Sequence, residues 1–315
     1  MQDSRRFARR AAVLRQHLVA PASIEADIEG ILRSETSAAL DAEAEKDVIT
    51  YKVLDGGIGL VTLNRPTRLN SLTNEMQALY FDMLEKAAAD ERVRVIVVTG
   101  AGRAFCAGAE MELLKTIGKS DSTVASKPRR SLKQSQATRI PKPIIAAING
   151  PAAGLGFVLA MHADIRFTTS KAKFTSAFAK RGLVAEHGSS YIMPRVAGVS
   201  NALDILLSSR VFLGDEAKEL GIVSRVYPDA DALMKATLEY AREMATWCSP
   251  ASMAEMKRQV YEHLDRDQDS SYTVSDDLMK KSFQHPDSKE GVASYVEKRE
   301  PTFQGLKAGF IRDQK

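Results

Sequence analysis

Two short apolar runs, each followed by a glycine turn, limit what this chain can fold into more than any other feature. Val95–Val98 leads toward the turn Ala107-Gly108-Ala109, and Ile144–Ile148 leads toward the turn Gly154-Leu155-Gly156. An unbroken apolar run of this length is typical of a strand buried on both faces, as in a parallel sheet covered by helices. We therefore expect an α/β core in which each turn leads from a strand into a helix, with Glu110 in the first helical turn.

The segments around these runs alternate between strand and helix patterns. Thr50–Leu54 and Ile58–Leu63 alternate apolar and polar residues across a glycine turn, which predicts a hairpin. Thr73 is placed to cap a helix that continues to Leu84, and from Ala230 onward the pattern is helical only. Alternation of this kind predicts right-handed β-α-β crossovers.

The composition is that of an ordinary globular protein and argues against several classes of function. The 315 residues are 44% apolar and 27% charged, with a formal net charge of +4. No aromatic residues are interleaved with a basic cluster, so we expect no nucleic-acid partner. Cys106 and Cys248 form neither a disulfide framework nor a metal-ligand pattern, so we expect no metal and a reducing compartment. No apolar run approaches the roughly 18 residues that span a bilayer, so we expect no membrane partner and a cytoplasmic location.

Residues 1–46 form a separate segment, which we interpret as a helical or partly disordered arm. Its first twenty residues contain five arginines and a single acid, Asp3. An Arg-rich amphipathic segment is compatible with a mitochondrial presequence, which would change the location, or with an ordinary surface helix. The globular pattern begins near Ile49, and we expect a core over residues 47–228 and a helical region over residues 229–315.

The two glycine turns also suggest a chemistry. Such turns present free backbone N–H groups, and two that converge can hold a thioester oxygen as it becomes an anion. The sequence shows neither a nucleophile triad nor metal-ligand spacing, which leaves Glu186 as the best candidate for moving protons. His187 is placed to orient Glu186 or to act as a second base, and Asp204 lies on a helix that could reach the same pocket, although a surface position is commoner. This combination predicts enolate chemistry on an acyl thioester.

Several motifs carry a family resemblance: Val97–Gly100, Arg103–Glu110, Lys142–Gly150, Ala163–Arg166, Pro194–Gly198, Ala217–Val223, Glu290–Ala293 and Glu297–Arg299. Through these motifs the chain resembles the crotonase (enoyl-CoA hydratase/isomerase) superfamily over about residues 49–305. The resemblance implies an α/β fold, the crotonase (ClpP-like) spiral of β-β-α units with a helical C-terminal trimerisation region. It also implies assembly as a homotrimer or homohexamer.

The resemblance also assigns residues that meet the substrate. It implies an acyl-CoA thioester whose carbonyl oxygen lies between the backbone amides of Ala109 and Leu155. It implies no cofactor, since coenzyme A is part of the substrate. Contacts with the CoA portion are implied for Arg68, Ala107, Lys298 and Arg299.

Two departures from the family pattern bear on the reaction. A family hydratase uses two glutamates to add water, and their positions correspond here to Val158 and to Phe178 of the pair Ala177-Phe178. Both acids are missing, so water addition by the two-glutamate route is not expected. Glu186 instead falls where isomerase and dehalogenase members carry a single active acid.

The sequence therefore predicts an enzyme of acyl-CoA or fatty acid metabolism, and most concretely an enoyl-CoA isomerase that uses Glu186 as acid and base. Three alternatives stay open at this point. The first is an enoyl-CoA hydratase that uses Glu186 alone, and the second is a retro-Claisen acyl-CoA hydrolase in which His187 or Glu186 activates water. The third is a catalytically silent CoA-binding paralogue whose N-terminal arm recruits a partner.

Overall fold

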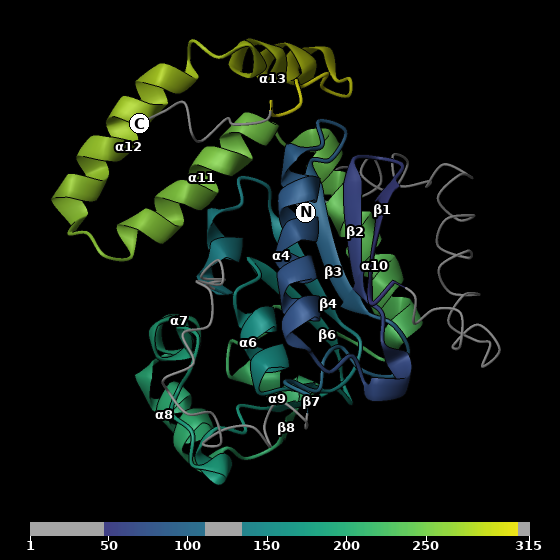
Figure 1. Ribbon diagram of the computed structural model, residues 1–315. Helices are drawn as coiled ribbons and strands as arrows, with labels where there is room; N and C mark the ends of the chain where they lie inside the picture. The colour runs from purple at the N-terminus through teal and green to yellow at the C-terminus, as the bar shows by residue number, and fades with distance from the viewer. Residues whose placement is uncertain (1–46, 111–133, 308–315) are drawn as a thin grey trace, which may run out of the picture. The chain divides into compact units, whose positions relative to one another are not determined.

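A six-stranded sheet holds the two predicted buried strands side by side at its centre (Figure 1). The computed structural model describes residues 47–110 and 134–307. The first two strands pair antiparallel as the predicted hairpin, and all other neighbours in this sheet are parallel. In spatial order the strands are β1 (Ile49–Leu54), β2 (Ile58–Leu63), β3 (Val95–Gly100), β4 (Ile144–Ile148), β6 (Ile165–Thr169) and β9 (Arg225–Tyr227).

Burial explains why β3 and β4 occupy the centre of the sheet. Every residue of both strands is buried, and the two pair in a register that begins with Ile96 opposite Ile144. A second, three-stranded sheet begins between β4 and the glycine turn at Gly154. It consists of β5 (Ala152–Ala153), β7 (Lys173–Thr175) and β8 (Phe212–Leu213).

Two long helices cover the larger sheet. α4 (Asn74–Ala89) begins at Thr73, whose hydroxyl accepts a hydrogen bond from the Met76 amide, as the capping prediction requires. α10 (Ala230–Trp247) begins at Asp229 and packs on β2, β3, β4, β6 and β9. In Figure 1, α4 lies in front of this sheet and α10 behind it. A parallel sheet with both faces covered is the arrangement that its continuous apolar strands predict.

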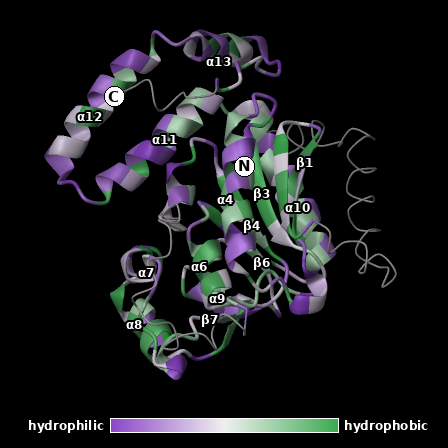
Figure 2. Cartoon of the chain, in the orientation of Figure 1, coloured by the Kyte–Doolittle hydropathy of each residue, from purple (hydrophilic) through white to green (hydrophobic). Residues whose placement is uncertain are grey.

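Shorter helices carry the chain from β4 to α10. The first of them, α6 (Leu155–Met161), is buried along its whole length and is green with the central strands in Figure 2. The others are η3 (Ala179–Arg181), α7 (Ser189–Ala197), α8 (Val199–Ser208) and α9 (Gly214–Glu219), and η1 (Pro66–Arg68) and η2 (Gln134–Arg139) precede them in the chain.

The C-terminal region is helical, as predicted, and a buried ion pair joins it to the sheet. Its helices after α10 are α11 (Pro250–His263), α12 (Gln268–Ser282) and α13 (Pro286–Glu297). On α11, Lys257 lies 2.6 Å from the Asp164 carboxylate, and the Tyr261 hydroxyl donates to the same group at 2.9 Å. α12 buries none of its residues, and a role of this region in trimer formation stays a prediction.

The α/β fold class is confirmed. Glu110 itself is not helical: its amide donates to Leu72 O at 3.0 Å beside a parallel bridge between Leu72 and Ala109. The helix predicted to follow this turn lies outside the described residues. The predicted arm over residues 1–46, and the mitochondrial alternative that depends on it, lie outside the described residues. Within the described ranges, none of the helices combines the length and the apolar character needed to cross a bilayer.

Candidate active site

The first glycine turn is held between two other segments of the chain. Cys106 exchanges hydrogen bonds with Pro151–Ala153, at 3.0 Å for each bond. On the other side, the Ala107 amide donates to Leu69 O at 2.9 Å, and the Leu72 amide donates to Gly108 O at 2.8 Å. The backbone of this turn is therefore fixed from both sides before any substrate binds.

The Ala109 amide is left free by this arrangement. Leu72 donates to Gly108 O at 2.8 Å and accepts from the Glu110 amide at 3.0 Å, so both neighbours of Ala109 face Leu72. Successive N–H groups of an extended chain point in opposite directions, so the Ala109 amide points away from Leu72. It donates to no other residue in the part of the chain that the structure describes.

Gly108 brings the two glycine turns into contact. Its φ of +100° and its surroundings both require glycine, because a Cβ there would lie 2.7 Å from Ala153 O and 3.5 Å from the Leu155 nitrogen. Leu155 is the first residue of α6, and its amide likewise donates to no described residue. Two unused amides thus lie on turns that touch at Gly108. That they serve one carbonyl oxygen stays a prediction.

Glu110 and Arg65 stabilise the first turn from outside. The Arg65 guanidinium contacts the Glu110 carboxylate at 2.9 Å and donates to Ser71 O at 2.8 Å. This pair gives Glu110 a structural role. Arg68 lies three residues after Arg65, at the end of η1, and is exposed. The carbonyl of the next residue, Leu69, accepts the hydrogen bond from the Ala107 amide. The structure therefore brings together two of the residues predicted to contact CoA, Arg68 and Ala107.

Glu186 and His187 lie in a tight turn between η3 and α7. His187 has a φ of +54° and Gly188 a φ of +79°, so two successive residues are left-handed. The Glu186 carbonyl accepts from the Ser189 amide at 2.9 Å and from its hydroxyl at 2.6 Å, which closes the turn. The Glu186 carboxylate lies 3.1 Å from His187 Nε2, and both side chains are about one-third exposed. The predicted pairing of these two side chains is present.

Other candidate residues lie in settings that do not favour chemistry. Asp204 forms a surface ion pair with Arg210 at 2.7 Å, so the structure places it at the surface. Arg299, at the end of α13, contacts the carboxylates of Glu290 and Glu297 at 2.6 Å each. Lys298 is the left-handed residue that ends the same helix. Within the described ranges, neither Arg299 nor Lys298 is hydrogen-bonded to Arg68 or Ala107. The contact of Arg299 and Lys298 with CoA stays a prediction.

Comparison with known proteins identifies the family. The model of the enoyl-CoA hydratase/isomerase family matches residues 54–306. The chain belongs to this family. It is 32% identical over 256 residues to 1,2-epoxyphenylacetyl-CoA isomerase of Escherichia coli (strain K12), a match that covers 80% of this chain and 97% of that protein.

Further relatives carry hydratase names. Enoyl-CoA hydratase EchA19 of Mycobacterium tuberculosis is 33% identical over 247 residues, with 78% of this chain and 92% of that protein covered. Among solved structures, the enoyl-CoA hydratase EchA12_1 of Mycobacterium marinum is 42% identical, with a TM-score of 0.59 and coverage of 68% of this chain and 97% of that one. The family is therefore established, whereas the relatives' names divide between isomerase and hydratase.

The positions of the two missing hydratase acids are apolar and closed. Val158 on α6 is fully buried, and Phe178 is only 6% exposed beside Ala177, which is 8% exposed. Neither a valine nor a phenylalanine side chain can transfer a proton, so these positions do not provide the two-glutamate route.

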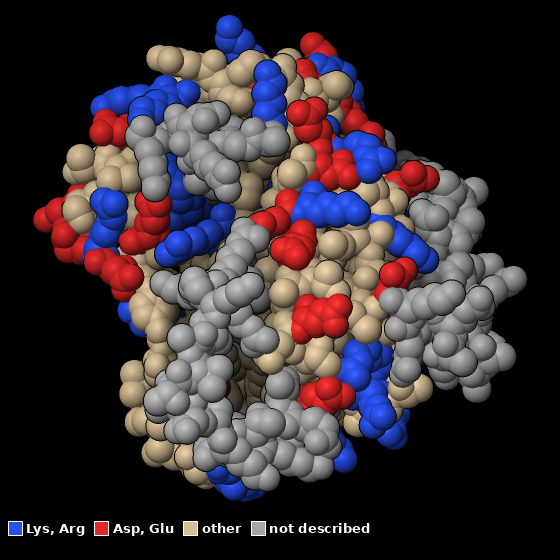
Figure 3. Space-filling view, viewed as in Figure 1, with Lys and Arg blue, Asp and Glu red and all other residues tan. Residues whose placement is uncertain are grey.

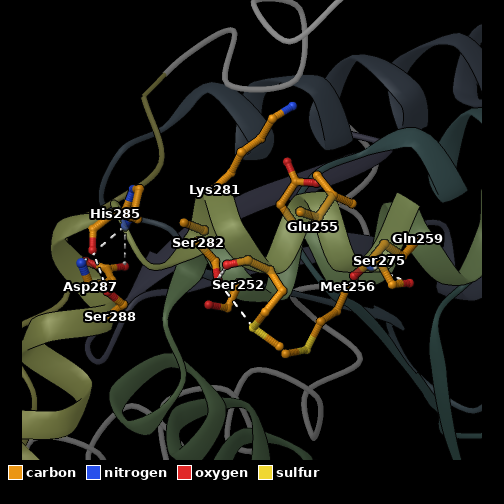
Figure 4. A pocket seen from close by; sticks show the side chains of 13 residues that line it. Ser252, Glu255, Met256, Gln259, Ser275, Lys281, Ser282, His285, Asp287 and Ser288 are labelled. Carbon is orange, nitrogen blue, oxygen red and sulfur yellow. Dashed lines mark hydrogen bonds and ion pairs between the residues drawn. The ribbon is translucent and has the colours of Figure 1, made fainter. Parts of the chain in front are cut away.

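A cavity of about 410 Å³ lies elsewhere, between α11, α12 and the start of α13 (Figure 4). Met256 and Met279 line it from two of these helices, and Gln259 donates to the Ser275 hydroxyl across it at 3.2 Å. None of the residues predicted for the site lines this cavity. Charges of both signs are interspersed on the face shown in Figure 3, so this view shows no large basic field.

His162 lies near the turn that carries Glu186, and no local sequence pattern indicates this position. His162 follows α6 directly, is 3% exposed, and lies against Gly188 of the turn that carries Glu186. In sequence it has the pattern of a buried helix residue, and no local signal places its ring beside a turn that lies 24 residues further along the chain. That contact exists only in the tertiary structure.

Proposed function

We propose that this enzyme holds an acyl-CoA thioester by its carbonyl oxygen, stabilises the enolate, and acts as an enoyl-CoA isomerase that shifts a double bond. The observation that carries the proposal is the contact between the two glycine turns at Gly108, with the amides of Ala109 and Leu155 unused. Backbone donors aimed at a developing oxyanion supply some of the largest single terms in enzyme catalysis, about 3–4 kcal/mol for one donor.

In the proposed reaction, Glu186 acts as base and then as acid. Its carboxylate removes a proton from C2 of a 3-enoyl-CoA, and the electron pair of the broken C–H bond delocalises onto the thioester oxygen. The Ala109 and Leu155 amides hydrogen-bond that oxygen. The same carboxyl group then returns its proton to C4, which forms the new C–H bond and leaves the double bond between C2 and C3.

An isomerase is favoured over a two-glutamate hydratase because Val158 and Phe178 occupy the acid positions. A retro-Claisen hydrolase is a second candidate, and the 3.1 Å contact between Glu186 and His187 favours it. An imidazole oriented by a carboxylate is suited to taking a proton from water. Hydration through Glu186 alone and a silent CoA-binding role are the remaining alternatives, and the experiment below separates all four.

The substrate contacts and the assembly belong to the same proposal. Arg68 and Ala107 would contact the CoA portion near the first turn, and Lys298 and Arg299 would do so from the end of α13. We propose no cofactor besides the CoA of the substrate. We also propose a homotrimer or homohexamer, since apolar side chains on the C-terminal helices, such as Met256 and Phe283, are mostly exposed in one chain. Light scattering at micromolar concentration tests this, and a monomer contradicts it.

The deciding experiment incubates the purified protein with 3-enoyl-CoA, with 2-enoyl-CoA and with a 3-oxoacyl-CoA, the substrate class that retro-Claisen cleavage requires, in separate reactions in D₂O. Chromatography with mass spectrometry distinguishes the outcomes, because isomers share a mass and differ in retention, hydration adds one water, and cleavage releases a shorter acyl product. Interconversion of the two enoyl-CoAs supports the isomerase, and deuterium at C2 or C4 reports how far the proton on the carboxyl group exchanges with solvent before it is returned. Hydration or cleavage supports the corresponding alternative, and an unchanged substrate supports the silent paralogue.

Glu186→Gln tests the assignment of the base. The change keeps the size of the side chain but removes the carboxylate, so we expect proton exchange at C2 to fall by about 10²–10⁴-fold while acyl-CoA binding changes little. The matched control is Asp204→Asn, which neutralises a surface carboxylate and leaves exchange unchanged. Normal exchange in Glu186→Gln means that another group is the base.

A further inference from the structure

The buried imidazole of His162 faces the turn that carries Glu186. His162 is 3% exposed and ends α6, the helix that begins with Leu155. A Cβ built on Gly188 would lie 3.6 Å from His162 Nε2 and 4.0 Å from its Cε1. The edge of the ring that contains Nε2 therefore lies directly under this turn.

The other ring nitrogen fixes the tautomer. His162 Nδ1 lies 2.9 Å from the Val158 carbonyl oxygen, which only accepts hydrogen bonds, so Nδ1 carries the proton. In the neutral ring Nε2 then has a free lone pair, and no residue in the described ranges donates to it. In a buried histidine of this kind, a hydrogen bond holds Nδ1 and Nε2 faces the turn that carries Glu186. Such a ring can do more than fill space in the core.

The surroundings disfavour a charge on this ring. Burial lowers the pKa of His162, the hydrogen bond to Val158 O opposes this effect, and the neighbouring His187 and Arg166 act in the same direction as burial. Arg166 is close, since its guanidinium donates to the carbonyls of Met161 and Ala163, the two residues that flank His162 in the chain. Glu186 is the carboxylate on the facing turn, and it is already paired with His187.

The turn is supported from two sides. Ser189, which is fully buried, holds the Glu186 carbonyl through its amide and hydroxyl, and His162 lies beneath Gly188. His187 is not a glycine, and its left-handed conformation persists only where the surroundings hold it.

We propose that His162 is a positioning residue that holds the Glu186–His187 pair in register with the substrate. This inference rests on the proposed role of Glu186. α6 provides the amide of Leu155 at its start and the contact with the base-carrying turn immediately after its end. One short, buried helix therefore fixes the distance between the group that holds the enolate oxygen and the group that moves the proton. A misplacement of about 1 Å in such an arrangement costs up to 10²-fold in rate.

Two substitutions at His162 test the roles of its two ring nitrogens separately. In His162→Asn, the shorter amide keeps a donor near the place of Nδ1 for Val158 O but has no atom at the place of Nε2. In His162→Gln, the longer side chain brings a polar atom to the place of Nε2. We expect His162→Asn to lower kcat for isomerisation at least about tenfold with KM changed less than about twofold, and His162→Gln to recover much of the loss.

Controls distinguish positioning from simple loss of structure. Thermal unfolding measures the folded fraction of each variant, and His263→Asn on α11 makes the same change outside the site and leaves kcat unchanged. In the double variant with Glu186→Gln, the loss should equal that of Glu186→Gln alone, because His162 acts through Glu186.

Several results overturn the inference. One is a wild-type kcat in His162→Asn, and another is a loss in both variants that only follows their folded fraction, which assigns His162 a structural role. Additive losses in the double variant also overturn it. If Glu186→Gln itself has normal activity, the proposed function fails, and that result is separate from any outcome at His162.

Discussion

Gly108→Ala is the most direct test of the proposed oxyanion hole, because Gly108 is where the two turns meet. The new methyl group would lie 2.7 Å from Ala153 O, whereas real Cβ contacts are essentially never under 3.0 Å and are ordinary from 3.4 Å. The turns must therefore separate by 0.3 to 0.7 Å, the difference between 2.7 Å and the limits of 3.0 and 3.4 Å. Leu155, two residues after Ala153, moves with the second turn, so its amide shifts relative to that of Ala109.

A displacement of this size is large for a hydrogen bond. Donors in an oxyanion hole act at about 2.7–3.1 Å, and loss of one donor costs about 10²–10³ in kcat. Because the displacement weakens a donor without removing it, we expect kcat of Gly108→Ala to fall by about 10–100-fold. KM should change less, because Ala107 is the only proposed CoA contact that lies on either displaced turn.

The control must reproduce the backbone strain without the clash. Gly198 has a φ of +77°, and a Cβ there meets nothing within 4 Å. Since its ψ is 160° as well, Gly198→Ala introduces a backbone strain of about 1–3 kcal/mol without pushing the turns apart. Steady-state kinetics with 3-enoyl-CoA and thermal unfolding are measured on both variants. If Gly108→Ala keeps kcat within about threefold of the wild type while it stays folded, the two amides do not act together and the reasoning is wrong.

Three further outcomes follow from the structure. Lys257→Met leaves the Asp164 carboxylate half-buried without its ion-pair partner, so the free energy of unfolding in denaturant should fall by about 3 kcal/mol, and an unchanged value means that the pair contributes nothing. Burial raises the pKa of Cys106 to about 12, so iodoacetamide at mildly alkaline pH should modify only the exposed Cys248 in the folded protein, and rapid reaction at Cys106 contradicts its burial. Removal of residues 1–46 should leave turnover of a free acyl-CoA largely unchanged, because the family match begins after them, and a folded truncated protein that is inactive shows that the arm completes the site.

The sequence by itself indicated most strands of the larger sheet and the helices that alternate with them. Ile144–Ile148 forms a strand over the predicted residues, since a continuous apolar run between turn residues has few places to lie other than the centre of a covered sheet. Thr73 caps α4 for an equally local reason: its hydroxyl reaches an amide three residues away. Such features depend on neighbours in the chain and are therefore visible in the sequence.

The sequence also indicated the turns and the acid, but only through local patterns and family resemblance. It did not show that Gly108 lies against Ala153 and Leu155, because that contact joins segments about 45 residues apart. Nor did it show that the Glu110 amide donates to Leu72 O beside the bridge between Leu72 and Ala109, because these segments are far apart in the chain.

His162 marks the limit most clearly. Its apolar surroundings in the sequence predict burial, which is correct, but burial alone does not say what the ring faces. The contact with Gly188 depends on how α6 packs against the turn before α7, and that packing is set by the combined burial of many side chains rather than by any local pattern. The sequence thus determined which groups are available for chemistry, and only the tertiary structure decided which of them meet.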